Sequence, residues 1–491
     1  MKRYILSIDQ STQGTKALLF DETGELVGRV DAEHEQMISD EGWVSHNPVE
    51  IYNNTIKVAR KVVEEADIPK EAVVALGISN QRETSLAWDK ETGQPFTDAI
   101  VWQCARAMKI CEELDEDKKT FIRTHTGMPA SPYFPAAKMA WILKHVKEAR
   151  EKAKRHQICY GTMDTWLVYK LTEGESYKTD FSNASRTQLF DIFKLQWNAH
   201  ICEMFGIDSV DLPEVCDSNA NFGETDLDGF LPCRIPIRAV MGDSHGALFG
   251  QGCLDAGMIK ATYGTGSSIM MNIGKTPILS KHGVVTSLAW SMNGEVTYVL
   301  EGNLNYTGAV VTWLKDDLEM VNTPSETERL AVEAYKEDSV YLVPAFSGLG
   351  APYWDSDARA SLVGMTRTTG KREFVRAAIE CSAYQITDII HAMREDAKVQ
   401  VKEIRVDGGA TKNAYLMQFQ SDIADAIVKV PDAEELSGIG VAYAAGIAVK
   451  LWNEEVFGKL KRKDFRPQMK RDIVQKKYEG WKDAVESVLH K

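Results

Sequence analysis

The sequence predicts an α/β fold built from two halves of similar plan. Strand-like segments at 72–79, 235–241 and 402–407 alternate with apolar helical segments, which is the pattern of an α/β protein. A strand, a Ser/Thr/Gly-rich turn and a second strand occur near the N-terminus and again within 255–273. The chain of 491 residues is long enough for two or three domains. We therefore expect at least two lobes, which share one architecture.

The first half opens with a predicted three-stranded meander. "RYILSID" (3–9), "KALLF" (16–20) and a strand beginning "LVGRV" (26–30) are separated by the polar turns "QSTQGT" and "DETGE". A helix is expected over 47–66, because Asn47 can cap it and Pro48 can occupy its first position.

The second half contains two apolar segments that predict packed helices, 371–393 and 438–451. The second begins "GIGVAY", which offers Tyr443 where a dinucleotide-binding fingerprint needs its third glycine, and no clear strand leads directly into it. We interpret its glycines as a site of close helix packing. "NIGKT" (272–276) has Ile269 where a P-loop needs glycine, so it is not a Walker A site.

Charge and composition limit the classes of partner that this protein can have. A net charge of −14 disfavours nucleic acid as a partner, and no apolar run reaches the roughly 20 residues that a membrane span needs. The N-terminus lacks the apolar core of a signal peptide. The eight cysteines form no CxxC pair, as expected in a reducing compartment. We expect a cytoplasmic protein without membrane or nucleic-acid contacts.

Three Gly/Thr-rich turns lie far apart in the sequence: "DQSTQGTK" (9–16), "YGTGS" (263–267) and "VDGGATKN" (406–413). Each offers backbone N–H groups and hydroxyls without bulky side chains, which suits a phosphate cradle. Any one of them could be an ordinary hairpin or capping turn. Their repetition in both halves favours a nucleotide cleft between two lobes.

The stretch "VMGDSHGALFGQG" (240–252) places Asp243 after an apolar strand, where a carboxylate is either a proton acceptor or a polar turn residue. Longer segments resemble a known family. "YFPAAKMAWILKH" (133–145) and "ASLVGMTRTTGKREFVRAAIE" (360–380) are similar to the two signature segments of the FGGY carbohydrate kinases. Within that family, 79–103, 346–367 and 413–423 are most similar to glycerol kinases.

This resemblance implies two ribonuclease-H-like lobes of the actin and sugar-kinase superfamily, with ATP in the cleft between them. The first lobe, residues 1–249, would bind the sugar or polyol and carry the first phosphate loop. The second, residues 250–491, would bind the nucleotide. The family commonly forms dimers and tetramers, so the resemblance also implies a homo-oligomer.

The resemblance also implies a role for individual residues. Asp243 would be the general base, and Asp9 and Asp243 would hold Mg²⁺ largely through water. Substrate contacts would come from Arg82, Glu83, Trp102, Tyr133, Asp243, Ser244 and Ser268. Nucleotide contacts would come from Thr12, Gln13, Gly14, Thr15, Lys16, Gly264, Thr265, Gly266, Gly308, Thr312, Gly409 and Asn413.

The sequence departs from glycerol kinases at four of these positions. Lys16 occupies a position where glycerol kinases usually have Arg, and Thr312 occupies one where they usually have Gln. In the substrate pocket, Ser244 replaces a Gln and Ser268 replaces a Phe, which enlarges the pocket and adds hydroxyl groups. The resemblance makes glycerol the first candidate substrate. The larger pocket makes a substrate of four or five carbons the alternative: erythritol, another tetritol, or a pentulose such as xylulose or ribulose.

Two further questions stay open at this point. An actin-like ATPase or chaperone shares the lobes and would bind no sugar, although the cluster around Arg82 and Asp243 argues against it. His245, next to the predicted base, could act on Asp243 or the substrate, or could be a buried structural histidine.

Overall fold

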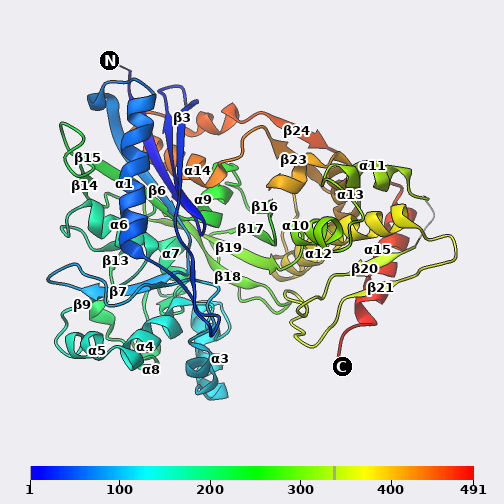
Figure 1. The fold of residues 1–491 in the computed structure, drawn as a ribbon, viewed down its shortest axis with the longest axis horizontal. Helices are drawn as coiled ribbons and strands as arrows, with labels where there is room; N and C mark the ends of the chain where they lie inside the picture. The colour runs from blue at the N-terminus through cyan, green and yellow to red at the C-terminus, as the bar shows by residue number, and fades with distance from the viewer. Residues whose placement is uncertain (1, 336–338, 491) are drawn as a thin grey trace.

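The computed structural model describes residues 2–335 and 339–490, and its two lobes are each built around a mixed β-sheet (Figure 1). In the order of their pairing, the first sheet contains β14 (Glu224–Thr225), β15 (Ile235–Gly242), β6 (Val73–Asn80), β1 (Tyr4–Gln10), β2 (Gly14–Phe20) and β3 (Leu26–Glu33). The second contains β18 (Val285–Met292), β19 (Glu295–Leu304), β17 (Ser267–Gly274), β16 (Met258–Tyr263), β22 (Glu403–Asp407), β23 (Ile427–Pro431) and β24 (Arg462–Phe465).

The two sheets repeat one plan, which confirms the predicted likeness of the two halves. In the first, β1, β2 and β3 form an antiparallel meander, and β6 and β15 continue the sheet in parallel on the other side of β1. In the second, β16, β17 and β19 form the meander, and β22 and β23 continue in parallel beside β16. The loops that follow β1 and β16 therefore occupy equivalent places.

The predicted helices form with nearly the expected bounds. Helix α1 (Pro48–Glu65) begins after Asn47, whose side chain accepts hydrogen bonds from the backbone N–H groups of Val49 and Glu50. The other long helices are α3 (Glu116–Thr126), α4 (Pro135–His145), α6 (Met163–Leu171), α9 (Asp243–Gly250), α11 (Glu326–Glu333), α12 (Lys371–Ala397), α13 (Ala414–Ala424), α14 (Leu436–Ala448) and α15 (Arg471–Glu486). Shorter ones are α2 (Met108–Glu112), α5 (Lys147–Ala153), α7 (Phe181–Ser185), α8 (Ala199–Met204) and α10 (Gly308–Thr312).

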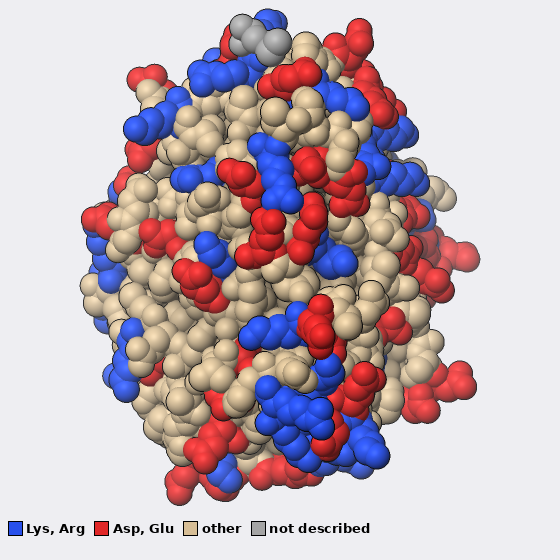
Figure 2. Space-filling model, turned by 90° about the vertical axis from the view of Figure 1, so that its left-hand side faces the viewer, with Lys and Arg blue, Asp and Glu red and all other residues tan. Residues whose placement is uncertain are grey.

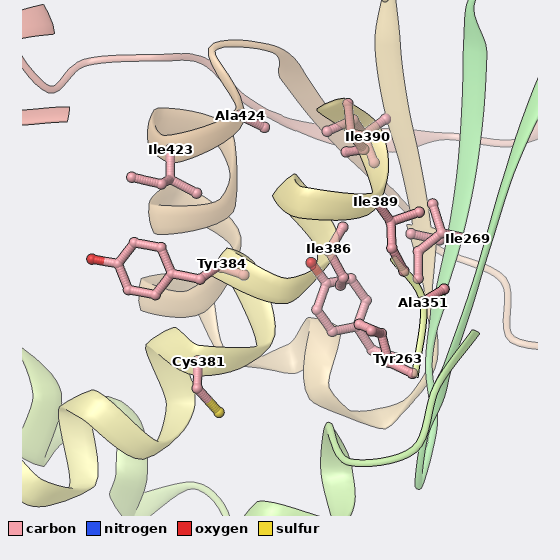
Figure 3. Close-up of a cluster of buried hydrophobic side chains, with 14 of the residues drawn as sticks. Tyr263, Ile269, Ala351, Cys381, Tyr384, Ile386, Ile389, Ile390, Ile423 and Ala424 are labelled. Atoms are coloured by element: carbon pink, nitrogen blue, oxygen red, sulfur yellow. The ribbon is translucent and has the colours of Figure 1, made fainter. Parts of the chain in front are cut away.

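Helix α12 lies between the second sheet and α13, and forms the centre of the second lobe's core (Figure 3). Its side chains Ile386, Ile389 and Ile390 are fully buried. Ile389 packs over Gly302 of β19, where an added Cβ would lie 2.7 Å from the isoleucine side chain. This layer holds the second sheet, and with it the loop after β16, in place.

Helices α9 and α14 pack through glycines, which confirms the interpretation of "GIGVAY". A Cβ on Gly440 of α14 would lie 1.9 Å from the carbonyl oxygen of Gly246 in α9, so the two backbones touch there. Helix α14 also packs on β1, β6 and β15 of the first sheet. A helix from the second half of the sequence therefore joins the first sheet to the start of α9.

A third sheet and several short helices extend the first lobe. This sheet contains β4 (Met37–Ile38), β5 (Val44–His46), β8 (Ala99–Ile100), β7 (Ser85–Asp89) and β9 (Ile158–Thr162). Three two-stranded ribbons pair β10 (Lys178–Asp180) with β13 (Glu214–Cys216), β11 (Phe190–Asp191) with β12 (Gln196–Trp197), and β20 (Tyr341–Val343) with β21 (Ser361–Val363).

The outer side of the first lobe faces the viewer in Figure 2, and acidic and basic side chains are intermixed over it. Within the described residues, no helix combines the length and the apolar character that crossing a membrane requires.

Candidate active site

A cavity of about 890 Å³ lies between the two lobes. Its walls come from the β1–β2 turn, the segment after β6, the start of α9, strands β16, β17 and β19, and residues 434–437, which span the start of α14. The residues predicted to contact the substrate all line it: Arg82, Glu83, Trp102, Tyr133, Asp243, Ser244 and Ser268. The fold thus brings residues that lie far apart in the sequence to one cavity.

Asp243 is the first residue of α9, directly after β15 ends at Gly242. Its carboxylate oxygen Oδ1 lies 3.2 Å from Nε of Arg82, and 36% of the side chain is exposed. Gly242 permits this approach, because a Cβ there would lie 2.5 Å from Cγ of Arg82. Burial raises the pKa of Asp243, Arg82 opposes the rise, and the negative charge of Glu83 adds to it. The carboxylate is therefore fixed in place and still open to the cavity.

A buried ionic network supports Arg82. Its two terminal nitrogens contact both oxygens of Glu301 at 2.9 and 3.0 Å. Arg186 contacts Glu301 at 2.9 Å and Glu83 at 2.7 Å. Burial alone would raise the pKa of Glu301, but the guanidinium groups of Arg186 and Arg82 hold it well below its usual range. Because Glu301 lies on β19, these ion pairs link the two lobes.

Thr12 and Lys16 from the first predicted phosphate loop line the cavity, and Asp9 lies beside them. Oγ1 of Thr12 accepts a hydrogen bond from the indole of Trp102 at 3.0 Å, and Lys16 pairs with Glu435 at 2.7 Å. Burial raises the pKa of Asp9 to about 7, with Lys16 opposing and Asp243 adding to the rise. These contacts tie the loop to both the aromatic wall and the segment before α14.

The remaining predicted residues of this loop are not part of the cavity wall. Gln13 is exposed, Gly14 lies against the backbone of Ala32, and Thr15 is a buried residue of β2 paired with Gln10. They shape the turn from which Thr12 and Lys16 project.

The second predicted phosphate loop lies against the start of α10. Thr265 and Gly266 line the cavity, while Gly264 accepts a backbone hydrogen bond from Gly308 at 2.9 Å. A Cβ on Gly308 would lie 2.5 Å from the carbonyl oxygen of Gly264, which explains the glycine there. The contact orders the loop beside the cavity.

Thr312, Gly409 and Asn413, like Gly264 and Gly308, lie outside the cavity wall. Thr312 and Gly409 are exposed, and Asn413 caps α13 while donating a hydrogen bond to Thr327 at 3.2 Å. The neighbouring Gly408 does line the cavity, with a φ of +96° that a side chain would strain.

The part of the cavity lined by the predicted substrate residues has an aromatic wall and a polar end. Trp102 and Tyr133 pack edge to face with their ring centres 5.6 Å apart. At the other end, the Oγ atom of Ser268 is buried with no hydrogen-bond partner in the described structure, and Asn303 lies opposite it on β19. His245 is buried behind this wall, 3.4 Å from the hydroxyl of Ser287.

Several residues of the site escaped prediction from the sequence. Glu301 and Lys260 are charged residues inside apolar strands, and that placement was the available signal, since such residues are rarely buried without a role. Arg186 and Glu435 gave no comparable signal, because their partners come from the tertiary fold.

The described residues contain no group of three or more His, Cys, Asp or Glu arranged to hold a metal ion. All eight cysteines are free thiols.

Known proteins resemble this chain along its whole length. Residues 4–250 match the N-terminal domain of the FGGY family of carbohydrate kinases, and residues 259–449 match its C-terminal domain. Glycerol kinase 1 of Thermotoga maritima is 47% identical over 490 residues, covering 99% of each chain. The glycerol kinase of Natranaerobius thermophilus is 43% identical over 492 residues, covering 100% of this chain and 99% of the relative.

Solved structures agree with this assignment. A crystal structure of Plasmodium falciparum glycerol kinase with ADP matches with a TM-score of 0.93 and 34% identity, covering 100% of this chain and 99% of that one. A xylulose kinase from Lactobacillus acidophilus shares the fold, with a TM-score of 0.89 and 20% identity over 99% of this chain and 98% of that one. The chain therefore belongs to the FGGY family of carbohydrate kinases.

Proposed function

We propose that this protein transfers the γ-phosphoryl group of ATP to a hydroxyl of a small polyol, with glycerol as the first candidate. The observation that carries the proposal is the Asp243 carboxylate, held 3.2 Å from Arg82 and open to a cavity that both phosphate loops approach. The high identity to glycerol kinases over the full chain supports glycerol.

In this reaction Asp243 accepts the proton of the attacking hydroxyl. The oxygen bonds to the γ-phosphorus as the bond to the bridging oxygen breaks, and ADP leaves with that oxygen. Such transfer depends mainly on positioning and charge neutralisation, so one carboxylate is enough. Arg82 holds the carboxylate toward the cavity.

The polyol is held by charged and aromatic groups. Arg82 donates two of its five N–H groups to Glu301, and its Nε lies 3.2 Å from Asp243, which leaves the other two N–H groups of its terminal nitrogens for substrate hydroxyls. Glu83 uses Oε1 on Arg186 and keeps its other oxygen as an acceptor. Trp102 and Tyr133 provide the apolar wall for the carbon chain. Hydrogen bonds to charged groups are roughly twice as strong as neutral ones, which favours a ligand dense in hydroxyls.

The nucleotide is bound from both lobes. Lys16 and Thr12 contact its phosphates from the first loop, in a turn shaped by Gln13, Gly14 and Thr15. Gly264, Thr265 and Gly266 contact them from the second. Gly308, Thr312, Gly409 and Asn413 lie toward the nucleoside.

The residues present fit Mg²⁺. Oδ1 of Asp9 is buried without a hydrogen-bond partner among the described residues, and Asp243 is close enough to raise its pKa. Mg²⁺ accepts one or two carboxylates together with water and substrate phosphates, so these two residues suffice to hold it. When bound, the ion neutralises charge on the phosphate oxygens.

A second candidate substrate is a polyol or ketose of four or five carbons. The hydroxyl of Ser268, beside Asn303, supports this candidate because it has no hydrogen-bond partner among the described residues. A longer substrate would form a hydrogen bond with this hydroxyl, which glycerol would leave unpaired. Ser268→Phe should then raise the ratio of kcat/KM for glycerol over erythritol. An unchanged ratio would show that Ser268 does not select the substrate.

The test of the function is ADP release coupled to a panel of glycerol, erythritol, xylulose and ribulose. We expect stimulation by at least one of them. Steady ATP hydrolysis that none of them stimulates would contradict the proposal and favour an actin-like ATPase.

We further propose that residues 1–249 and 250–491 close as two lobes around the substrates, with α14 packed on the first sheet as their connection. Closure would exclude water from the transferring phosphoryl group. The family resemblance supports a dimer or tetramer, and the free thiols support work in the reducing cytoplasm.

A further inference from the structure

We propose that Lys260 is a catalytic residue whose ammonium group binds the phosphoryl group as it passes from ATP to the substrate. This inference rests on the proposed function. Its starting point is that Lys260 is a buried cation in the wall of the cavity.

Strand β16 directs Lys260 toward the cavity. Its neighbours Ile259 and Ala261 belong to the buried core of the second lobe, and successive side chains of a strand point to opposite faces. Lys260 and Thr262 accordingly line the cavity, and the second phosphate loop begins directly after the strand. The ammonium therefore comes from the rigid strand that supports the loop.

Lys260 differs from the other cations of the wall. Lys16 is paired with Glu435 at 2.7 Å and Arg82 with Glu301 at 2.9 Å. Lys260 is 1% exposed, and its ammonium group has no hydrogen bond or ion pair within residues 2–335 and 339–490. Burying a charge without a partner costs free energy. A bound anion beside the Lys260 ammonium would offset that cost.

Charged groups of both signs surround Lys260. Burial lowers the pKa of its ammonium, the nearby carboxylates of Asp407 and Asp243 oppose that shift, and the guanidinium of Arg82 adds to it. A dianionic phosphoryl group arriving between the two loops would supply the missing partner.

In the transfer, Lys260 neutralises charge on the non-bridging oxygens. The bond from phosphorus to the bridging oxygen of ADP breaks, the bond to the substrate oxygen forms, and the proton of that oxygen goes to Asp243. Lys260 keeps its own protons throughout. An ammonium group interacts most strongly with the phosphoryl oxygens in the transition state. The contact should therefore raise kcat more than it lowers KM.

The test compares Lys260→Met with Lys260→Arg and with the surface control Lys402→Met, whose lysine is exposed beside Asp255. Two quantities are measured: kcat on the best polyol, and the tightening of ADP binding by aluminium fluoride and Mg²⁺, which mimics the transferring group. We expect Lys260→Met to lose about 10²- to 10³-fold in kcat, the usual cost of removing one such donor. It should also lose the fluoride-dependent tightening, with the Kd for ADP alone unchanged and Lys260→Arg partly restoring both.

Unchanged kcat, or an equal loss of ADP affinity with and without fluoride, would overturn the proposal. If the circular dichroism of Lys260→Met is altered, Lys260→Gln, which keeps an uncharged donor, is read by the same two quantities. The fluoride measurement needs no turnover, so it tests Lys260 even if the wild-type protein phosphorylates none of the polyols.

Discussion

Among single residues, Asp243 is central to the proposed function, and several contacts hold its carboxylate in place. It starts a helix, where backbone N–H groups favour negative charge, and Arg82 fixes one of its oxygens. The same arginine depends on Glu301, which comes from the other lobe. The carboxylate is therefore positioned by contacts from both halves of the chain.

Asp243→Asn should lower kcat by about 10²- to 10⁴-fold, the range for loss of a general base. Nucleotide affinity should change little, because the amide keeps the size of the carboxylate. Steady-state kinetics and ADP titration measure both, with exposed Asp40→Asn as the control. Turnover near the wild-type rate would remove Asp243 from its role.

Glu301→Gln should destabilise the protein by about 3–5 kcal/mol, since it removes the buried carboxylate that the guanidinium groups of Arg82 and Arg186 share. Urea unfolding measures the loss. The matched control is Glu175→Gln, which breaks an exposed pair with Arg234 and should cost less than about 1 kcal/mol. Equal losses in the two variants would contradict the importance of the buried network.

His46 gives the protein a defined dependence on pH. Burial lowers the pKa of its imidazole to about 4, with His34 nearby adding to the shift, against 6.5 for an ordinary histidine. Below pH 6.5 the unfolded chain binds this proton and the folded chain does not, so stability falls as the pH drops toward 4.

Compared with His46→Gln, the wild type should lose up to about 3 kcal/mol between pH 6.5 and 4, from about 1.4 kcal/mol per pH unit. Denaturant unfolding at several pH values measures the difference. Parallel stability curves for the two proteins would show that His46 takes up its proton normally when folded.

At the scale of elements, the glycine-rich segments divide into two kinds. The turns 9–16 and 263–267 were predictable as loops beside the cavity, because Ser, Thr and Gly cluster between strands there. "GIGVAY" was predictable as a helix contact, because its spacing fails the nucleotide fingerprint. The residues predicted to contact the nucleoside, such as Thr312, lie outside the cavity wall, and sequence spacing does not determine where such positions lie.

Gly440→Ala should destabilise the contact between α9 and α14 by about 1–3 kcal/mol, since its Cβ would lie 1.9 Å from the backbone of Gly246. Activity should fall with it, because α9 carries Asp243. Gly458→Ala is the control, as an added Cβ there meets nothing within 4 Å. Thermal unfolding that does not separate the two variants would rule out tight packing at Gly440.

At the scale of the whole molecule, the two sheets of one plan were predictable because the strand–turn–strand pattern repeats. The residues that complete the site through ion pairs were not predictable from the sequence. Glu301, Arg186 and Glu435 acquire their roles only when segments more than 100 residues apart meet, and a single sequence carries no record of such pairing. Lys260 stood out only as a charge within an apolar strand.

In the proposed reaction, the two lobes together move a phosphoryl group from ATP to a polyol oxygen. ³¹P NMR of the protein with ATP, Mg²⁺ and glycerol or erythritol tests it most directly. We expect one new phosphomonoester resonance that grows in step with ADP and requires the polyol. Growth of ADP with orthophosphate alone, whichever polyol is present, would contradict it.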